Sequence, residues 1–244
     1  MKHVGQCAHA STGHYRRPMR KPVSNTPSRP RAGNASGAGQ VRLIGGRWRG
    51  SKLAVADAPG LRPTSDRVRE TLFNWLQPML PGARVLDLFA GSGALGLEAL
   101  SRGAASAVLV ERDPALAASV LATTWRLPGG EAAAVVQADA LAWLPAQPRA
   151  SFDLAFVDPP FAAGLHGQVL AALAPLLAER AWLYIESALA ENPDMPPGWC
   201  VHREGRTREV RYALYRRLPS AGAPADTLDD DPAGANASLH EPRD

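Results

Sequence analysis

A short apolar run that is closed by a glycine-rich turn, with a helical pattern directly behind it, restricts the folds open to this chain more than any other segment. Residues 84–89 form the run and Ala90-Gly91-Ser92-Gly93 forms the turn. Apolar residues then recur with helical spacing as far as Arg102-Gly103. This order predicts a strand, a glycine loop and a helix.

The same order recurs along the middle of the chain. Residues 107–111, 133–137 and 152–158 are apolar runs, and each is followed by a helix start or by prolines; residues 181–186 form one further apolar run. Strands that are separated by helical patterns imply right-handed crossovers in one sheet. We therefore expect an α/β fold with a mostly parallel, doubly wound sheet, whose ligands bind at the carboxyl ends of its strands.

The segments on either side of this middle part differ in pattern. Residues 41–55 alternate apolar and polar side chains around three glycines, which predicts a small β ribbon. Thr64-Ser65-Asp66 is typical of a helix start, and the apolar stripe behind it predicts a helix. Residues 199–206 and 210–218 indicate a terminal antiparallel hairpin. We expect a ribbon and helix over 40–80 and the main α/β domain over 81–218.

The two ends of the chain have opposite charge. Residues 1–40 carry seven Lys or Arg and no acid, whereas residues 219–244 carry six acids and one Arg. Both ends are poor in large apolar residues, so we expect disordered tails over 1–39 and 219–244. A nucleic-acid-binding arm, an over-long start and an organelle transit peptide are alternatives for the basic tail.

Several classes of protein do not fit the composition. Cys7 and Cys200 are the only cysteines and lie far apart in the sequence, which argues against a disulfide framework and against a zinc site; we expect no metal. The apolar stretch 165–177 is too short and too interrupted to span a bilayer, so we expect no membrane role. A monomer in the cytoplasm is the expected form.

The glycine loop is the first candidate site. Asp87 lies at the carboxyl end of its predicted strand, and Gly91 and Gly93 let a ligand approach the backbone in front of a helix N-terminus. The spacing is neither a dinucleotide fingerprint nor a P-loop, and an ordinary structural turn is the alternative. Glu111 ends the next strand 24 residues after Asp87, near the spacing at which an acid binds ribose hydroxyls. An adenosine-containing cofactor is therefore expected.

The second candidate site is Asp158-Pro159-Pro160-Phe161, at the end of the fourth strand. Prolines that simply stop a strand are the alternative. A carboxylate and a proline-fixed carbonyl can also accept both hydrogens of an exocyclic amine, while Phe161 stacks on the base. Holding both N–H groups aims the amine lone pair at an electrophilic methyl group and helps to remove the proton.

Together these motifs resemble the class I amino-methyltransferases with a Rossmann-like fold. Three further segments narrow the resemblance to the RsmD family of ribosomal RNA guanine-N2 methyltransferases. They are Ile44-Gly45-Gly46-Arg47-Trp48-Arg49-Gly50, the run from Arg62 to Leu76, and the segment from Gly91 to Ala99. The resemblance covers about residues 40–218. It implies transfer of a methyl group from S-adenosylmethionine to a guanine of 16S ribosomal RNA in the small subunit.

The resemblance also implies roles for individual residues. Asp158, Pro159, Pro160 and Phe161 would hold a guanine that is flipped or unpaired, because a base edge inside a stacked helix is inaccessible. The cofactor would be bound by Thr64, Arg67, Glu70, Asp87, Phe89, Ala90, Gly91, Ser92, Gly93, Glu111, Arg112, Asp139 and Ala140. An ordinary solvated helix face is the alternative for the three residues between 64 and 70.

Two positions depart from the family pattern. Thr123 stands where the family tends to have Asn, which concerns helix packing more than chemistry. Arg208 stands where the last hairpin usually has a glycine, which leaves the turn and its RNA contacts open.

Basic residues gather in two parts of the sequence, and we expect them to bind phosphates of the RNA. The expected RNA-binding residues are Arg47, Trp48, Arg49, Lys52, Arg206 and Arg208. A DNA adenine-N6 methyltransferase is one alternative function, because the Asp-Pro-Pro-Phe tetrad suits both amines. A non-catalytic ribosome-assembly factor on a methyltransferase fold is another. A small-molecule methyltransferase would leave the tetrad and the basic residues unexplained.

Overall fold

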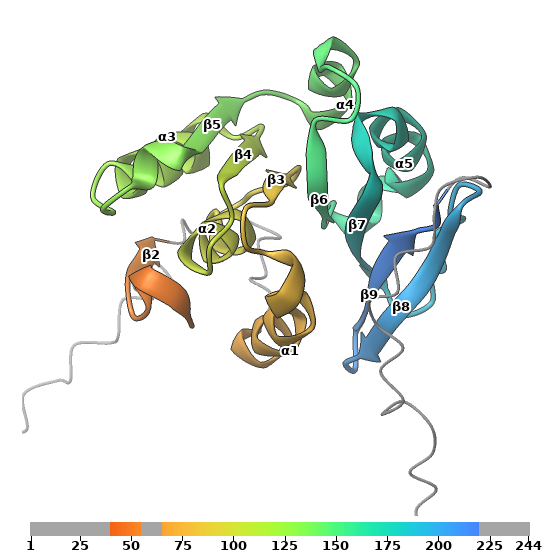
Figure 1. Ribbon diagram of the computed structural model, residues 1–244, viewed down its shortest axis with the longest axis horizontal. Helices are drawn as coiled ribbons and strands as arrows, with labels where there is room; N and C mark the ends of the chain where they lie inside the picture. Colours follow the sequence, from red (N-terminus) through yellow and green to blue (C-terminus); the bar gives the residue numbers. More distant parts are fainter. Residues whose placement is uncertain (1–39, 55–64, 220–244) are drawn as a thin grey trace, which may run out of the picture. The chain divides into compact units, whose positions relative to one another are not determined.

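The computed structural model describes residues 40–54 and 65–219. Within these residues seven strands form one sheet in the order β5-β4-β3-β6-β7-β9-β8 (Figure 1). The strands are β3 (Arg84–Asp87), β4 (Ser106–Glu111), β5 (Ala133–Gln137), β6 (Phe152–Val157), β7 (Leu177–Ala188), β8 (Trp199–Arg206) and β9 (Val210–Arg217). The first five are parallel to one another, β9 runs antiparallel to β7, and β8 runs antiparallel to β9. The predicted doubly wound sheet with a terminal hairpin is confirmed.

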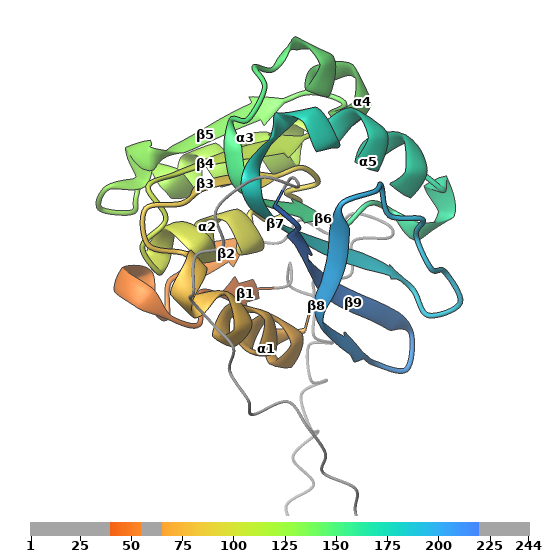
Figure 2. The ribbon, with the colours of Figure 1, turned by 45° about the vertical axis from the view of Figure 1, so that its right-hand side comes forward.

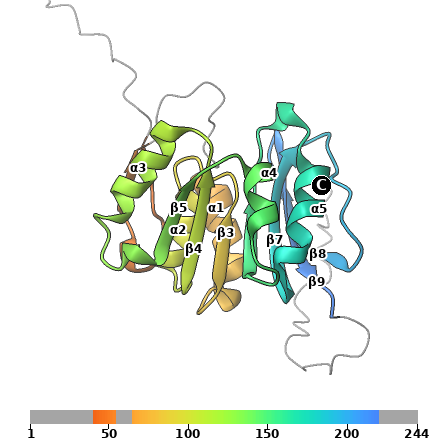
Figure 3. The same cartoon turned by 90° about the horizontal axis from the view of Figure 1, so that it is seen from above.

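Helices cover both faces of this sheet (Figures 2 and 3). They are α1 (Asp66–Leu76), α2 (Ala94–Ser101), α3 (Pro114–Thr124), α4 (Ala140–Trp143) and α5 (His166–Leu173). Three of them begin at a side chain that accepts backbone N–H groups, namely Ser65 for α1, Asp113 for α3 and Asp139 for α4. The helix after residue 139 is a single turn and is followed by a 3-10 turn that contains Pro145.

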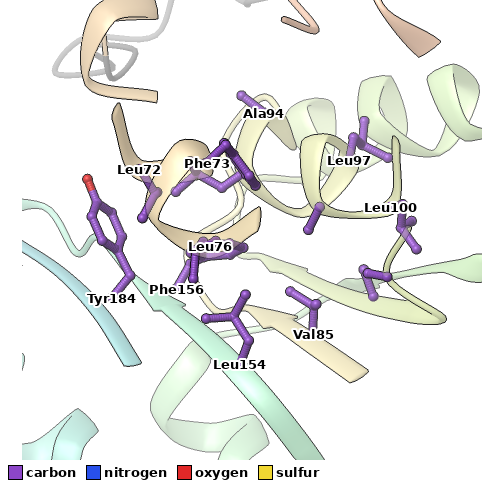
Figure 4. Close-up of a cluster of buried hydrophobic side chains, with 14 of the residues drawn as sticks. Leu72, Phe73, Leu76, Val85, Ala94, Leu97, Leu100, Leu154, Phe156 and Tyr184 are labelled. Carbon is purple, nitrogen blue, oxygen red and sulfur yellow. The ribbon is translucent and has the colours of Figure 1, made fainter. Parts of the chain in front are cut away.

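Two apolar cores lie on the two faces of the sheet. On one face, α1 and α2 pack on alternate residues of β3, β6 and β7, such as Val85, Phe156 and Tyr184 (Figure 4). On the other face, α4 and α5 pack on the intervening residues of the same strands, such as Leu86 and Ile185. The alternation follows from the period of two along a strand, so Asp87 belongs to the face that α1 and α2 cover.

The expected ribbon is present but short. β1 (Gln40–Arg42) pairs with β2 (Lys52–Ala54), and a 3-10 helix, η1 (Gly46–Trp48), lies between them. Glu98 of α2 holds the ribbon by accepting backbone N–H groups of Ile44 and Gly45 at 2.7 and 2.8 Å. Ribbon, α1 and sheet share one hydrophobic core, so the boundary expected near residue 80 does not separate two independent cores.

Two glycines, one in the loop after β3 and one in α2, suit the close approach of the helix to the strand. Gly93 has φ 76°, and a Cβ at Gly96 would lie 3.2 Å from the Cβ of Asp87 and 3.0 Å from Leu109. L-residues rarely adopt the backbone conformation of Gly93, and a side chain at Gly96 would require its neighbours to shift. The two glycines therefore let α2 begin directly against the end of β3.

Candidate active site

Three neighbouring parallel strands each present a carboxyl group at the same edge and on the same face of the sheet. Asp87 ends β3, Asp158 follows the last residue of β6, and Glu186 lies near the end of β7. Phe156 pairs with both Asp87 and Tyr184 across the sheet. Since every second residue faces the same way, Asp158 and Glu186 share the face of Asp87.

Burial and mutual repulsion raise the pKa values of two of these groups. Asp87 is 3% exposed, and burial, more than the nearby charge of Glu111, raises its pKa to about 7 against the lowering effect of a 2.8 Å hydrogen bond from the Gly96 N–H. Burial also raises the pKa of Asp158 well above the usual range, with further contributions from Glu186 and Asp87. An edge that crowds carboxyl groups in this way favours a cationic ligand.

The glycine loop and Glu111 are joined by hydrogen bonds. Glu111, at the end of β4, accepts the Gly91 N–H at 2.8 Å through one carboxylate oxygen and the Asp113 N–H at 2.8 Å through the other. A carboxylate has about four lone-pair positions, so both oxygens can still accept ligand hydroxyls. The structure thus brings together Asp87, the Gly91 loop and Glu111, as expected from the sequence.

Of the remaining expected cofactor residues, some lie in the loops at the strand ends and others do not. Phe89, Ala90, Ser92 and Arg112 belong to the loops that follow β3 and β4, and Ala140 opens α4 after β5. Asp139 caps α4 by accepting the Ala142 N–H at 3.1 Å. Thr64 lies outside the described residues. Arg67 and Glu70 are exposed on α1, and within the described residues no hydrogen bond or ion pair of their side chains connects them to the strand ends.

The Asp-Pro-Pro-Phe tetrad lies at this same edge. Asp158 is partly buried, Pro159 is buried and Pro160 is exposed. Phe161 is 37% exposed, so its ring remains accessible for stacking. The tetrad therefore follows β6 in the middle of the sheet, directly beside the carboxyl of Asp87.

The two expected groups of RNA-binding residues lie at opposite edges of the sheet, one at the carboxyl ends of the parallel strands and the other at their amino ends. β9 runs antiparallel to β7 and pairs Val210 with Ala188, which places the β8–β9 turn, with Arg206 and Arg208, at the edge of Asp158. η1 instead packs at the carboxyl end of α2, where the Ser101 hydroxyl accepts the Trp48 N–H. Because α2 leads from the end of β3 back to the start of β4, this is the opposite edge.

Within the ribbon group, one residue is unsuited to stacking on RNA. Trp48 is only 3% exposed, and its indole N–H donates to the Pro128 carbonyl at 2.9 Å. Arg47 covers the Trp48 ring at 4.4 Å and donates to the Gly129 carbonyl. Arg49 and Lys52 are exposed. Trp48 therefore packs in the core, and it is not one of the residues that we propose to bind RNA.

Sequence reasoning missed a buried polar group at the end of β7. Glu186 is 4% exposed, and the Tyr184 hydroxyl donates to its carboxylate at 2.7 Å. A ring nitrogen of His166, at the start of α5, lies 2.8 Å from the Glu186 carbonyl oxygen. The available signal was the position of Glu186 at the end of a strand, which is shared with Asp87, Glu111 and Asp158.

Comparison with known proteins places the chain in a family. The family model described as Conserved hypothetical protein 95 matches residues 41–216. The Ribosomal RNA small subunit methyltransferase D of Escherichia coli (strain K12) is 48% identical over 196 residues, which are 79% of this chain and 98% of that protein. The protein of the same name from Haemophilus influenzae is 41% identical over 186 residues, 73% of this chain and 94% of that protein. The chain belongs to the RsmD family.

A solved structure supports the same assignment at the level of the fold. The structure of yhhF from Escherichia coli has a TM-score of 0.67 to this RsmD-family chain at 48% identity, and covers 75% of this chain and 100% of its own. The fold is the Rossmann-like methyltransferase fold that the resemblance implied.

The two departures from the RsmD pattern have structural explanations. Arg208 has no positive φ, and the β8–β9 turn is closed by Thr207, whose N–H donates to the Val210 carbonyl and whose hydroxyl accepts the Val210 N–H. The turn therefore needs no glycine. Thr123 is buried in α3, donates to the Ser119 carbonyl and accepts a hydrogen bond from Arg126, which is a packing role.

Within the residues described, no helix is both long and apolar enough to cross a membrane.

Proposed function

We propose that this chain transfers a methyl group from S-adenosylmethionine to the exocyclic N2 of a guanine in 16S ribosomal RNA, within the small subunit or a late assembly intermediate. The arrangement that carries the proposal is the tetrad at Asp158 beside Asp87 and the glycine loop, in a chain whose relatives are named for methylation of small-subunit ribosomal RNA. A monomer acting in the cytoplasm, where ribosomal subunits assemble, is part of the proposal.

The strand-end residues fit S-adenosylmethionine by charge and by shape. This cofactor supplies a methyl group on a positively charged sulfonium and also carries an ammonium group. Burial and, less strongly, the charge of Glu111 raise the pKa of Asp87, and a cation bound there would stabilise its carboxylate. The Gly91–Gly93 loop lets the methionine part approach the backbone, Glu111 accepts the ribose hydroxyls, and Asp139 with Ala140 borders the adenine.

The reaction asks two things of this chain. The Asp158 carboxylate and a carbonyl of the adjoining prolines accept the N–H groups of guanine N2, which directs the lone pair out of the ring plane. The bound cofactor would supply the methyl group and keep the electron pair of the broken bond, and N2 would become acidic on methylation. Asp158 then takes the released proton, for which its raised pKa suits it.

The accessible ring of Phe161 would stack on the guanine, and the arginines of the β8–β9 turn would bind nearby phosphates. The exposed Arg47, Arg49 and Lys52 of the ribbon would bind RNA that reaches the opposite edge. Two separated groups of basic residues suit a large structured substrate better than a short oligonucleotide.

Tritiated methyl transfer to purified small subunits, to naked 16S RNA and to duplex DNA tests the proposal, with the product nucleoside identified by chromatography. The substrates come from a strain that lacks the protein, so the target is unmethylated. We expect N2-methylguanosine in the subunits. N6-methyladenine in DNA as the main product would overturn the substrate, and cofactor binding without transfer to any of the three would favour an assembly factor.

A further inference from the structure

Glu186 lies beside Asp158 at the edge that carries the proposed chemistry, yet the reaction described above gives it no role. The pairing of Val157 with Ile185 puts the next residues, Asp158 and Glu186, in line on neighbouring parallel strands. Such strands lie about 4.8 Å apart. One nucleobase edge is long enough to reach both carboxyl groups.

The surroundings of Glu186 fix its orientation. The Tyr184 hydroxyl donates to one carboxylate oxygen at 2.7 Å, and His166 lies at hydrogen-bond distance from the backbone carbonyl. Tyr212 pairs with Glu186 across β7 and β9, and its ring stacks on Trp75 with centroids 5.7 Å apart. The bond from Tyr184 uses one of about four lone-pair positions of the carboxylate, so this contact does not prevent a further hydrogen bond.

Guanine presents an N1–H donor directly beside its N2 amine, whereas adenine and 2-aminopurine present a lone pair at N1. We infer that Glu186 determines the specificity for guanine by accepting the N1–H of the target base while Asp158 holds the N2 amine. This inference rests on the proposed function and deepens it. It assigns the two carboxyl groups to two adjacent donors on one base edge.

The assignment predicts strong discrimination by a single residue. A purine with a lone pair at N1 would face the Glu186 carboxylate acceptor to acceptor and would lose this hydrogen bond. Sites built around a hydrogen bond to a substrate N–H reject analogues that lack it by several orders of magnitude. The carboxyl groups of Glu186 and Asp158 also interact electrostatically, because Glu186 contributes to the raised pKa of Asp158.

The test replaces the target guanosine by 2-aminopurine riboside, which keeps the N2 amine but has no N1–H. Subunits are reconstituted with 16S RNA ligated from synthetic segments, and kcat/KM is measured for both bases with the unaltered full chain and with Glu186→Gln. We expect the unaltered chain to prefer guanine by about 100-fold or more. Glu186→Gln should reduce the preference at least tenfold, because the amide can either donate or accept.

Glu191→Gln is the matched control. Glu191 also lies next to His166, with 3.7 Å between its carboxylate and the ring nitrogen, but it lies beyond the end of β7. This variant should keep the full preference for guanine. Thermal unfolding and calorimetric cofactor titration confirm that each variant is folded. If Glu186→Gln does not fold, Tyr184→Phe, which removes the orienting hydrogen bond, should reduce the preference about threefold or more.

The outcomes separate this inference from the proposed function. An equal loss of kcat/KM on both bases in Glu186→Gln, or an unchanged preference in a folded variant, would overturn the role of Glu186 and leave guanine methylation intact. Failure of the unaltered chain to methylate guanine at all would remove the proposed function and this role with it.

Discussion

At the scale of single residues, the carboxyl groups of the strand-end edge differ in what surrounds them. Asp158 is partly exposed, has a raised pKa and follows β6, whereas Glu111 accepts the N–H of Gly91 in the loop after β3 and the N–H of Asp113 in its own loop. A group with a raised pKa is suited to accept a proton, and a carboxylate fixed by N–H donors is suited to hold hydroxyls. Substitutions of Asp158 and of Glu111 should therefore have different effects on catalysis and on cofactor binding.

Asp158→Ala should reduce kcat by about 100-fold or more, because both the amine acceptor and the proton acceptor are lost. The cofactor Kd should stay within a few-fold of that of the unaltered chain. Single-turnover methyl transfer and calorimetric titration measure the two quantities. A large loss of cofactor affinity would show that Asp158 belongs to the cofactor pocket.

Glu111→Gln should show the opposite behaviour. Loss of a charge-assisted hydrogen bond to the ribose should weaken cofactor binding by about 1.5–3 kcal/mol, while kcat at saturating cofactor changes little. Gln keeps an acceptor oxygen for the Gly91 N–H, so the loop should stay folded. Unchanged affinity in calorimetry would remove Glu111 from the pocket.

At the scale of elements, the β8–β9 hairpin carries its turn to the edge where Asp158 lies. The turn is closed by the backbone and hydroxyl of Thr207, and among the described residues Arg206 makes only a long, exposed contact of 3.4 Å with Glu204. Such exposed ion pairs contribute little to stability. The arginines of this turn can therefore exchange their protein contacts for phosphates without destabilising the fold.

Replacing both Arg206 and Arg208 by Ala should raise KM for subunits about three- to tenfold and leave kcat and cofactor Kd unchanged. The slope of log affinity against log salt should become shallower by up to about 0.7–0.9 for each phosphate contact removed. Filter binding over a salt series measures it. Arg126→Ala, an exposed arginine outside both basic groups, is the control and should leave the slope unaltered; an identical slope in the double variant would exclude the hairpin from RNA binding.

At the scale of the whole molecule, the fold holds two acids, Asp87 and Asp158, that form no salt bridge with any other described residue. Asp87 has a pKa of about 7 in the folded chain against an ordinary value of 3.8, and the pKa of Asp158 moves in the same direction. Carboxyls with raised pKa values hold their protons more tightly in the folded than in the unfolded state, so the free energy of unfolding falls as pH rises from about 4 to about 7. Arg84 lowers the pKa of Asp153, which acts the other way but only at lower pH.

Urea unfolding without cofactor should therefore give a higher free energy of unfolding at pH 5 than at pH 8. Asp87→Asn should raise the value at pH 8 by roughly 2–4 kcal/mol and change it much less near pH 4, because the amide oxygen can still accept the Gly96 N–H. Asp153→Asn, the control at the opposite edge, should leave the difference between pH 5 and pH 8 nearly unchanged. Equal stability of the unaltered chain at both values would contradict the assigned pKa of Asp87.

The sequence by itself determined the order of strands and helices, the loop at Asp87 and the tetrad at Asp158, because periodicity, glycine turns and prolines are local signals. Only the tertiary structure placed the basic residues of the ribbon and of the hairpin at opposite edges of the sheet. It also moved Trp48 from an expected RNA contact into the core and brought Glu186 next to Asp158. These features depend on strand order and on which side of the sheet each residue faces, so residues far apart in the sequence decide them together.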